Sequence, residues 1–384
     1  NFYLILHPIL TRENNMILTV LFWIFVAVVA IQFLYYIVIF GKFSFVKAKK
    51  NNLKKIPISV IVCAKNEAEN VTKFIPLLAQ QNYPDFEIIL IDDASSDTTL
   101  DIFEAFEKEY ANVRLVKVEN NEAFWGNKKF ALTLGIKAAS KEYLLFTDAD
   151  CYPTSTNWIA EMSSHFTMQK TIVLGYGAYD KIPNSFINKI IRFETLLTAV
   201  QYFSWARIGQ PYMGIGRNLA YKKEEFFNVN GFIDHMKIRS GDDDLFINQA
   251  ATSKNTTVCY TPESFTYSEP KTSYKEWFIQ KRRHVSTATF YKSFDKMQLG
   301  LFFLTQLLTF VLPIILLIFQ FQWIAVVSLV GFRYLFSWIS LGFGAGKLNE
   351  KDVMFWYPII EIVLIFTQIN IFITNLFSKP VHWK

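Results

Sequence analysis

The sequence predicts an α/β protein whose mostly parallel sheet lies between membrane-spanning segments at both ends of the chain. Two observations lead to this prediction. Short β-branched apolar runs alternate with helical segments through the middle of the chain, a pattern typical of parallel sheets. Near both ends lie uncharged apolar segments long enough to cross a bilayer, which takes about 20 residues.

The composition fits a membrane protein with a globular middle. Hydrophobic residues make up 52% of the 384 residues, 38 residues are Phe, and the apolar excess lies at the two ends. The formal net charge is +6, without the aromatic-interleaved basic patches of nucleic-acid binders, so we expect no nucleic-acid partner. The three cysteines are widely spaced and odd in number, which argues against a disulfide framework.

Four segments are predicted to span a membrane, namely residues 16–40, 299–319, 323–345 and 353–377. A run of basic residues after the first segment indicates that this end faces the cytoplasm: Lys42, Lys47, Lys49, Lys50, Lys54 and Lys55. The spans then alternate in direction, which leaves both termini outside.

This topology divides the chain into three parts. We expect an N-terminal segment with one transmembrane helix (1–41), a cytoplasmic domain (42–298) and a C-terminal bundle of three transmembrane helices (299–384). Arg333 and Glu361 fall inside the last two spans, where a charge is costly, so they should face the bundle and pair. They either line a path for a substrate or tie the helices together.

In the central part, strands are expected at residues 58–64, 87–91, 113–118 and 143–147, and helices at 68–80, 97–110 and 128–139. Ligands of such sheets bind beyond the carboxyl ends of the strands, and the polar clusters of this sequence lie there. Residues 185–212 mix apolar and charged side chains. They are expected to form either an amphipathic helix on the membrane or a plain surface helix.

Two acidic clusters follow predicted strands. Asp92 and Asp93 begin a run that ends at Asp97, and their carboxylates can accept hydrogen bonds from a uracil N–H or from ribose hydroxyls. The alternative is a turn in which Asp97 caps the next helix.

Asp148 and Asp150 follow the fourth strand two residues apart, so their side chains point the same way. This pair of hard oxygen ligands predicts a Mg²⁺ or Mn²⁺ site.

Two further clusters lie later in the chain. Residues 240–245 hold three adjacent carboxylates, which repel one another unless they are solvated, bound to a cation or shifted in pKa. The functional interpretation is a general base, and the alternative is a solvated acidic turn.

Residues 280–284 read Gln-Lys-Arg-Arg-His, and the planar fork of Arg suits pyrophosphate oxygens. The alternative is a basic anchor beside the membrane.

Taken in order, these clusters resemble glycosyltransferase family 2, specifically its membrane-bound branch of cellulose, chitin and hyaluronan synthases and ceramide-glucosyltransferase-like enzymes. The resemblance covers about residues 57–292 and the flanking spans. It implies a GT-A-type, Rossmann-like fold and metal-dependent, inverting transfer of a sugar from a nucleotide-sugar, with UDP as the implied carrier. We expect a lipid or lipid-linked acceptor at the cytoplasmic membrane face; the alternative is a processive polysaccharide synthase of the same family.

The matching motifs imply the site residues. Residues 64–67 resemble the loop that cups the base, 126–132 the Gly-Lys-x-x-Ala-Leu motif with one insertion, and 216–220 the loop beneath the acceptor. The resemblance implies nucleotide-sugar binding by Ala64, Glu67, Asp92, Asp93, Lys128, Asp148, Gln280, Arg283 and His284. It implies metal binding by Asp148 and Asp150, an acceptor-side position for Asn218, and catalysis by Asp243 as the base with Asp242 second.

One position departs from the family pattern. His284 stands where the Gln-x-x-Arg-Trp motif has Trp, a residue associated in processive synthases with the terminal sugar of the polymer. This change and the small number of predicted spans favour a single transfer. The expected partners are a nucleotide-sugar donor, a lipid or glycan acceptor and membrane lipids. The expected location is the plasma membrane of a bacterium, with the catalytic domain cytoplasmic.

Overall fold

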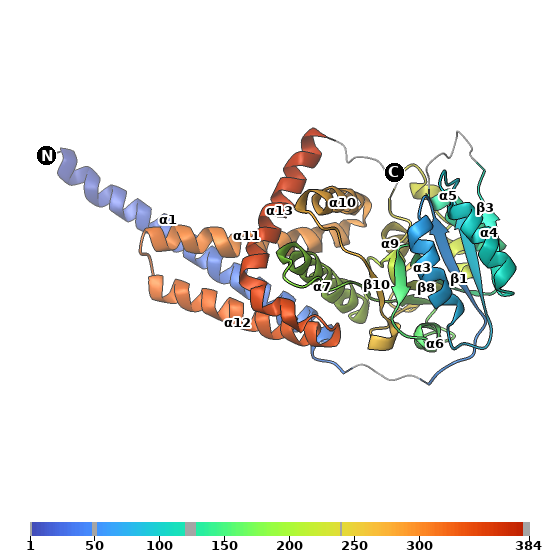
Figure 1. Ribbon diagram of the computed structural model, residues 1–384. Coiled ribbons are helices and arrows are strands. Elements are labelled where there is room, and N and C mark those ends of the chain that lie inside the picture. The colour runs from blue at the N-terminus through green and yellow to red at the C-terminus, as the bar shows by residue number, and fades with distance from the viewer. Residues whose placement is uncertain (1, 48–51, 120–127, 239, 379–384) are drawn as a thin grey trace.

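The computed structural model describes residues 2–47, 52–119, 128–238 and 240–378, with side chains from residue 15 onward (Figure 1). An α/β domain holds the sheets, and long apolar helices project from one end of it. Several residues of the motifs discussed above lie outside the described residues: Lys49, Lys50, Gly126 and Asn127.

The large sheet has the strand order β3-β2-β1-β4-β8-β6-β9. The first four strands in this order are parallel neighbours, and β8 alone runs antiparallel to the strands on both its sides. The prediction of a mostly parallel sheet is therefore confirmed. The bounds are β1 Ile58–Ala64, β2 Phe86–Asp92, β3 Val113–Lys117, β4 Tyr143–Asp148, β6 Ile172–Leu174, β8 Leu219–Lys222 and β9 Thr256–Val258.

Helices cover both faces of this sheet because its central strands are apolar on both faces. In β1, Val60 and Val62 pack on one side and Ile61 and Cys63 on the other. The first side is covered by α3 (Ala68–Ala79), α4 (Thr99–Glu109) and α6 (Trp158–Ser164), and the second by α5 (Lys128–Ala138) and α9 (Asp244–Ala250). The predicted strands and helices of residues 58–147 match the observed ones to within two residues at each end.

Smaller elements complete the domain. A second sheet has the order β5-β10-β7, and short helices connect the strands to the long helix α10. Their bounds are β5 Cys151–Pro153, β7 Gly177–Tyr179, β10 Thr266–Ser268, α8 Lys223–Asn228 and α10 Tyr274–Thr287, with 3-10 turns at Gly216–Asn218, Ile233–His235, Pro262–Ser264 and Ala288–Phe290.

Helix α7 (Phe186–Arg207) joins the α/β domain to the apolar helices. Most of its residues are buried, so it is neither a helix on the membrane nor a plain surface helix, and both interpretations of residues 185–212 are wrong. Arg192 explains why a segment with charges can be buried here. Its guanidinium donates to Asp352 at 2.6 and 2.8 Å and also to Glu350, in the loop and 3-10 turn before α13.

Among the described residues, four helices are long and apolar enough to cross a membrane. Helices α1, α11 and α12 pack side by side and extend together away from the domain (Figure 1). The bounds are α1 Phe2–Phe33 with its extension Leu34–Ile39 and α2 Gly41–Ser44, α11 Ser293–Ile318, α12 Trp323–Lys347, and α13 Tyr357–Phe377 after the 3-10 turn Lys351–Trp356.

A buried ion pair joins these helices. Arg333 of α12 donates to Glu361 of α13 at 2.6 Å, and both side chains are at most 2% exposed. Gln32 of α1, Gln306 of α11 and the Tyr357 hydroxyl bond to the same pair. The predicted pairing is confirmed, and the contacts favour the interpretation as a tie between helices. A polar group in an apolar bundle is stable only when its hydrogen bonds are satisfied inside the bundle.

We predict that Glu361→Ala destabilises the protein because it leaves the Arg333 guanidinium without its carboxylate. Breaking a buried pair by removing one partner costs about 3–5 kcal/mol of unfolding free energy. Thermal unfolding of the detergent-purified protein measures the effect. The matched control is Ile362→Ala at the next position, where the side chain is exposed. Equal midpoints for both variants would contradict a stabilising role for the pair.

Candidate active site

The candidate site lies at the carboxyl edge of the parallel strands. In the sheet register, Ala64 at the end of β1 pairs with Asp92 of β2, and Cys63 pairs with Asp148 of β4. The two acidic clusters that follow these strands therefore flank the end of β1. Because parallel strands all end at one edge, residues 56 positions apart in the chain become neighbours in space.

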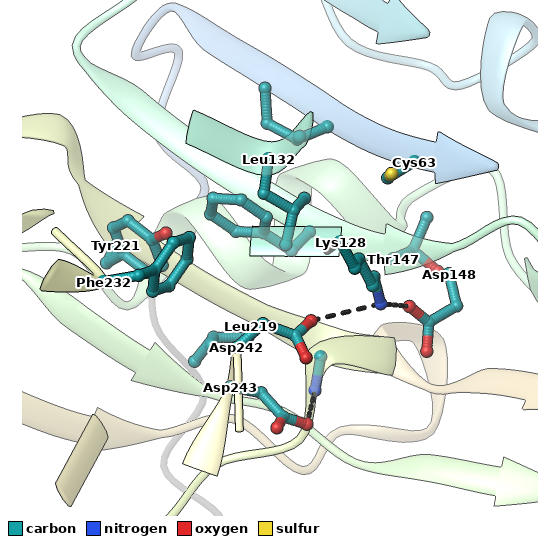
Figure 2. Close-up of a pocket in the computed structure, with 13 residues that line it drawn as sticks. Cys63, Lys128, Leu132, Thr147, Asp148, Leu219, Tyr221, Phe232, Asp242 and Asp243 are labelled. Carbon is teal, nitrogen blue, oxygen red and sulfur yellow. Dashed lines mark hydrogen bonds and ion pairs between the residues drawn. The ribbon is translucent and has the colours of Figure 1, made fainter. Parts of the chain in front are cut away.

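Lys128 connects two of the acidic clusters. It is the first residue of α5, and its Nζ lies 2.7 Å from Asp148 Oδ1 and 3.1 Å from Asp242 Oδ2 (Figure 2). Both carboxylates and the side chain of Asp243 line one cavity. Burial raises the pKa of Asp242, but the charge of Lys128 outweighs this effect, so the pKa lies below its ordinary value. Lys128 thus keeps Asp242 ionised and lets two like charges stay close together.

Asp243 is held differently from its neighbour. Its Oδ2 accepts from the Gly216 N–H at 2.6 Å and its Oδ1 from the Asp244 N–H at 2.7 Å, which fixes the carboxyl at the start of α9. Burial, followed by the charges of Asp242 and Asp244, raises the pKa of Asp243 to about 8. A carboxyl with a pKa near neutrality is suited to accept a proton from a hydroxyl.

Asp244 points away from the cavity. Its carboxylate accepts from Tyr291 at 2.7 Å and from the Thr287 hydroxyl at the end of α10. Burial raises its pKa, and these two hydroxyls partly offset the effect. The three adjacent carboxylates therefore have different surroundings. Asp242 pairs with Lys128, Asp243 has a raised pKa, and Asp244 connects α9 to α10.

Asp148, Asp150 and Cys151 form the candidate metal site, with one ligand atom from each within 4.8 Å of the others. The Cys151 thiol donates to Asp150 Oδ1 at 3.4 Å, and burial raises its pKa well above the ordinary value. A protonated thiol is a poor ligand, so the two carboxylates are the residues that fit a cation. Two carboxylate oxygens beside an open cleft suit a hard ion such as Mg²⁺ or Mn²⁺, which keeps further positions for phosphate and water.

The β2 side of the edge holds the predicted nucleoside-binding residues. Asp92 and Asp93 are both buried, and the Asp93 N–H donates to the Ala64 carbonyl at 2.9 Å. Burial raises the pKa of Asp93, and the charge of Lys65 partly offsets this. Asp92 Oδ2 accepts from the Ser95 N–H, whereas its Oδ1 has no hydrogen-bond partner among the described residues. A buried acceptor of this kind is suited to a ligand N–H or hydroxyl.

Glu67 begins α3 on the same side. Its carboxylate accepts from the Asn70 side chain at 2.6 Å. Burial raises its pKa, and the charges of Asp150 and Asp148 raise it further, which places Glu67 close to the metal-site carboxylates. The charges of the predicted metal site therefore reach the predicted base-cupping loop.

Gln280, Arg283 and His284 share one face of helix α10. Burial lowers the pKa of Arg283, and the nearby charges of Asp242 and Asp148 partly offset this. The side chain of His284 is exposed.

The side chain of Asn218 lies away from the cleft. It is fully buried, donates to the Tyr176 and Ser264 carbonyls at 2.9 and 2.7 Å, and accepts from the Trp158 indole at 3.1 Å. With its amide fully used, it can affect an acceptor only by holding the 3-10 turn Gly216–Asn218 in place.

Two residues of the site were missed by sequence reasoning. Arg217 donates to Ser268 and to the Gly177 carbonyl, both at 2.9 Å, and its charge counteracts the raising of the Asp150 pKa by burial and by Asp148. Lys129 is 1% exposed and donates to three backbone carbonyls in the loop before Asp242. Each residue lies inside a motif that the sequence analysis identified. Arg217 directly precedes Asn218, and Lys129 directly follows Lys128.

The comparisons with known proteins agree with this geometry. Residues 59–244 match the model of the family described as glycosyl transferase family 2. This match assigns residues 59–244, just under half of the chain, to glycosyltransferase family 2. The matched region includes residues 64–67, Lys128, Asp148, Asp150 and the acidic triplet.

Two relatives are similar to parts of this chain. A poly-beta-1,6-N-acetyl-D-glucosamine synthase from Staphylococcus epidermidis is 35% identical over 111 residues, which cover 29% of this chain and 25% of that protein. A cholesterol galactosyltransferase from Borreliella burgdorferi is 33% identical over 102 residues, 27% of each chain. This chain thus spans about a quarter of the length of these relatives.

A solved structure shows the fold over most of the chain. The mannosyltransferase PcManGT from Pyrobaculum calidifontis, in complex with GDP-Man and Mn²⁺, matches with a TM-score of 0.54 and 17% identity. The match covers 90% of this chain and 99% of that one. The GT-A-type fold predicted from the sequence is therefore confirmed.

We predict that Lys128→Ala lowers kcat/KM for nucleotide-sugar turnover by about 10²–10³-fold, the usual loss for one electrostatic donor. The variant removes the cation between Asp148 and Asp242, so the two carboxylates repel each other and any diphosphate nearby. Release of nucleoside diphosphate is the measurement. Lys137→Ala, at an exposed position on the same helix, is the control and should keep full activity. Equal activity of both variants would contradict this role.

Proposed function

We propose that the protein is an inverting glycosyltransferase that transfers a sugar from a nucleotide-sugar, with UDP as the favoured carrier, to a lipid or lipid-linked acceptor at a membrane surface. The observation that carries this proposal is the convergence of Asp148, Asp242 and Asp243 around Lys128 in one cavity. One group in this cavity can accept a proton, and others can neutralise a leaving diphosphate.

Asp243 acts as the base in this mechanism. It takes the proton of the acceptor hydroxyl while the hydroxyl oxygen bonds to the anomeric carbon, and the bond from that carbon to the diphosphate breaks. Lys128 and Arg283 stabilise the negative charge that develops on the diphosphate. A single displacement inverts the anomeric configuration and needs no covalent sugar–enzyme intermediate.

Asp150 and Asp148 would hold Mg²⁺ or Mn²⁺. When bound, such an ion neutralises diphosphate charge as a Lewis acid. The hard oxygen pair and the protonated thiol of Cys151 fit a divalent cation of this kind. The nucleoside would bind beside Ala64, Glu67, Asp92 and Asp93. The Oδ1 of Asp92, unpaired within the described part of the chain, would accept a hydrogen bond from an N–H of the base.

A lipid or lipid-linked acceptor fits the proximity of this cleft to the apolar helices. Helix α10 carries Arg283 and His284 at the cleft and contacts α13 on its other side. The second candidate is a processive polysaccharide synthase, as the polymer-forming relative named above suggests. His284 in place of Trp and the small number of apolar helices favour single transfer. The proposed location is a bacterial plasma membrane, with the catalytic domain in the cytoplasm.

A donor screen tests the proposal. Purified protein is incubated with UDP- and GDP-sugars, Mn²⁺ or Mg²⁺ and extracted membrane lipids, and released nucleoside diphosphate and lipid products are measured by mass spectrometry. We predict turnover with at least one donor, its loss with a chelator and its return with added Mn²⁺ or Mg²⁺. A product of one added sugar supports single transfer, and a growing ladder supports the synthase. Turnover that persists in chelator would contradict the metal site.

We predict that Asp243→Asn lowers kcat by about 10²–10⁴-fold, the contribution of a general base. Binding of nucleoside diphosphate should remain, because Lys128, Asp148 and Asp150 are untouched. Kinetics and calorimetric titration with UDP separate the two effects. Asp101→Asn, an exposed position on α4, serves as the charge-matched control. Retention of kcat in the Asp243 variant would exclude it as the base.

The pH dependence gives a separate check. A base works only when deprotonated, and the pKa of Asp243 is raised to about 8. We therefore predict that kcat/KM rises about tenfold per pH unit below pH ~8 and levels off above it. Initial rates with saturating metal in a series of buffers measure this profile. A flat profile between pH 6 and pH 8 would show that no group with this pKa limits the reaction.

A further inference from the structure

Both ends of α13 contact the same domain. At its start, Arg192 donates to Asp352 just before the helix, and Trp356 packs on Phe186 of α7 with ring centroids 5.5 Å apart. At its end, Arg282 of α10 donates to the Asn375 side chain at 3.0 Å and to the carbonyl and hydroxyl of Ser378 at 2.9 and 2.8 Å. Both α7 and α10 belong to the catalytic domain.

The middle of α13 is also attached to that domain. The hydroxyls of Thr367 and Tyr274 of α10 lie 2.9 Å apart. Figure 1 shows the consequence: α13 runs across the direction that α1, α11 and α12 share, between these helices and the domain. It contacts α10 and α7, and it meets α12 near its start, where Glu361 pairs with Arg333.

A membrane-crossing helix cannot make these contacts. The 21 residues of α13 extend about 30 Å, the thickness of the bilayer core. If α13 crossed, Ser378 would lie on the face opposite to the catalytic domain. Helices α11 and α12 show the contrast. Asn248 of the domain donates to Asp295 at the start of α11, the chain turns at Gln320, and Lys347 at the end of α12 returns to the carbonyls of Phe43 and Val46.

One face of α13 is exposed in the part of the chain that the structure describes. Ile359, Ile362, Phe366, Ile373 and Phe377 are 40–87% exposed, and their spacing of three, four, seven and four residues places them on one stripe. The opposite face holds the buried Glu361 and Thr367. A helix that exposes an apolar stripe on one face and bonds to the catalytic domain on another can lie along the membrane, and its contacts rather than its composition favour this placement.

We propose that α13 lies in the plane of the membrane, on the same side as the catalytic domain, with its apolar stripe inserted among phospholipid chains. The chain then crosses the bilayer three times, and residue 378 lies on the catalytic side, in place of the four spans and external C-terminus expected from the sequence. The phospholipid is the favoured occupant because the stripe continues the lipid-exposed surfaces of α11 and α12, such as Leu304 and Leu335.

This placement also positions the active site. Arg282, which holds the end of α13, precedes Arg283 and His284 on α10. An α13 embedded in one leaflet therefore fixes the height of the cleft above the lipid. The inference concerns topology and does not depend on which sugar, acceptor or reaction the site serves.

Cysteine accessibility tests the side of the membrane. Single cysteines are placed at Ser378, at Lys108 in the catalytic domain and at Gln320 in the turn between α11 and α12; the native cysteines are buried. Sealed vesicles of known orientation are treated with a membrane-impermeant maleimide. We predict that Ser378→Cys and Lys108→Cys react from one side and Gln320→Cys from the other. Reaction of Ser378→Cys together with Gln320→Cys would overturn the proposal.

Depth measurement tests the orientation and the occupant. Nitroxides are attached to Ile362→Cys, Phe366→Cys and Ile373→Cys in proteoliposomes, and their collision rates with oxygen and with a water-soluble nickel chelate are compared. We predict similar shallow depths at all three positions and high oxygen access. A steady change in depth of about 1.5 Å per residue would show a crossing helix. Low access to both reagents would show a protein, such as a second copy, covering the stripe.

Discussion

The site depends on holding two negatively charged carboxylates, Asp148 and Asp242, close together despite their repulsion. Asp148 and Asp242 come from distant parts of the chain and repel each other unless a cation lies between them. Lys128 is that cation, at 2.7 and 3.1 Å from the two carboxylates. Its position follows from α5 starting at the strand edge, so the fold itself delivers the compensating charge. A bound metal would add a second positive charge at Asp150, and an incoming diphosphate would find both already in place, which lowers the reorganisation cost of catalysis.

The same acidic triplet also couples chemistry to the membrane. Asp243 gains its basic character from burial and from its neighbours, while Asp244 turns away to bind Thr287 and Tyr291 at the end of α10. Helix α10 in turn is held by α13 through Arg282. A continuous set of polar contacts therefore runs from the base to a helix exposed to lipid. Under the proposed function, such an arrangement would give an acceptor that enters from the lipid a defined height relative to Asp243.

Sequence patterns predicted the parts of the fold that local periodicity determines. β1 to β4 and α3 to α5 were found because buried parallel strands and amphipathic helices have distinct periods, and ordered motifs then indicated the family. Residues 185–212 were misjudged because the partners of Arg192, at Glu350 and Asp352, lie about 160 positions away. In the sequence alone, a charged segment resembles a surface segment because the distant residues that pair with its charges cannot be identified. The outward turn of Asp244 and the burial of Asn218 likewise depend on tertiary partners. Hydropathy gives the length of α13 but not its direction, which its contacts with α7 and α10 determine.

The most direct measurement of the central claim is a crystallographic map of the protein with UDP and Mn²⁺, using the anomalous signal of manganese. The account requires one manganese peak at the Asp148 and Asp150 carboxylates, with the diphosphate between it and Lys128 and with Asp243 facing the same cavity. A peak at residues 242–244 instead, or a nucleotide bound away from the carboxyl edge of β1, would contradict it.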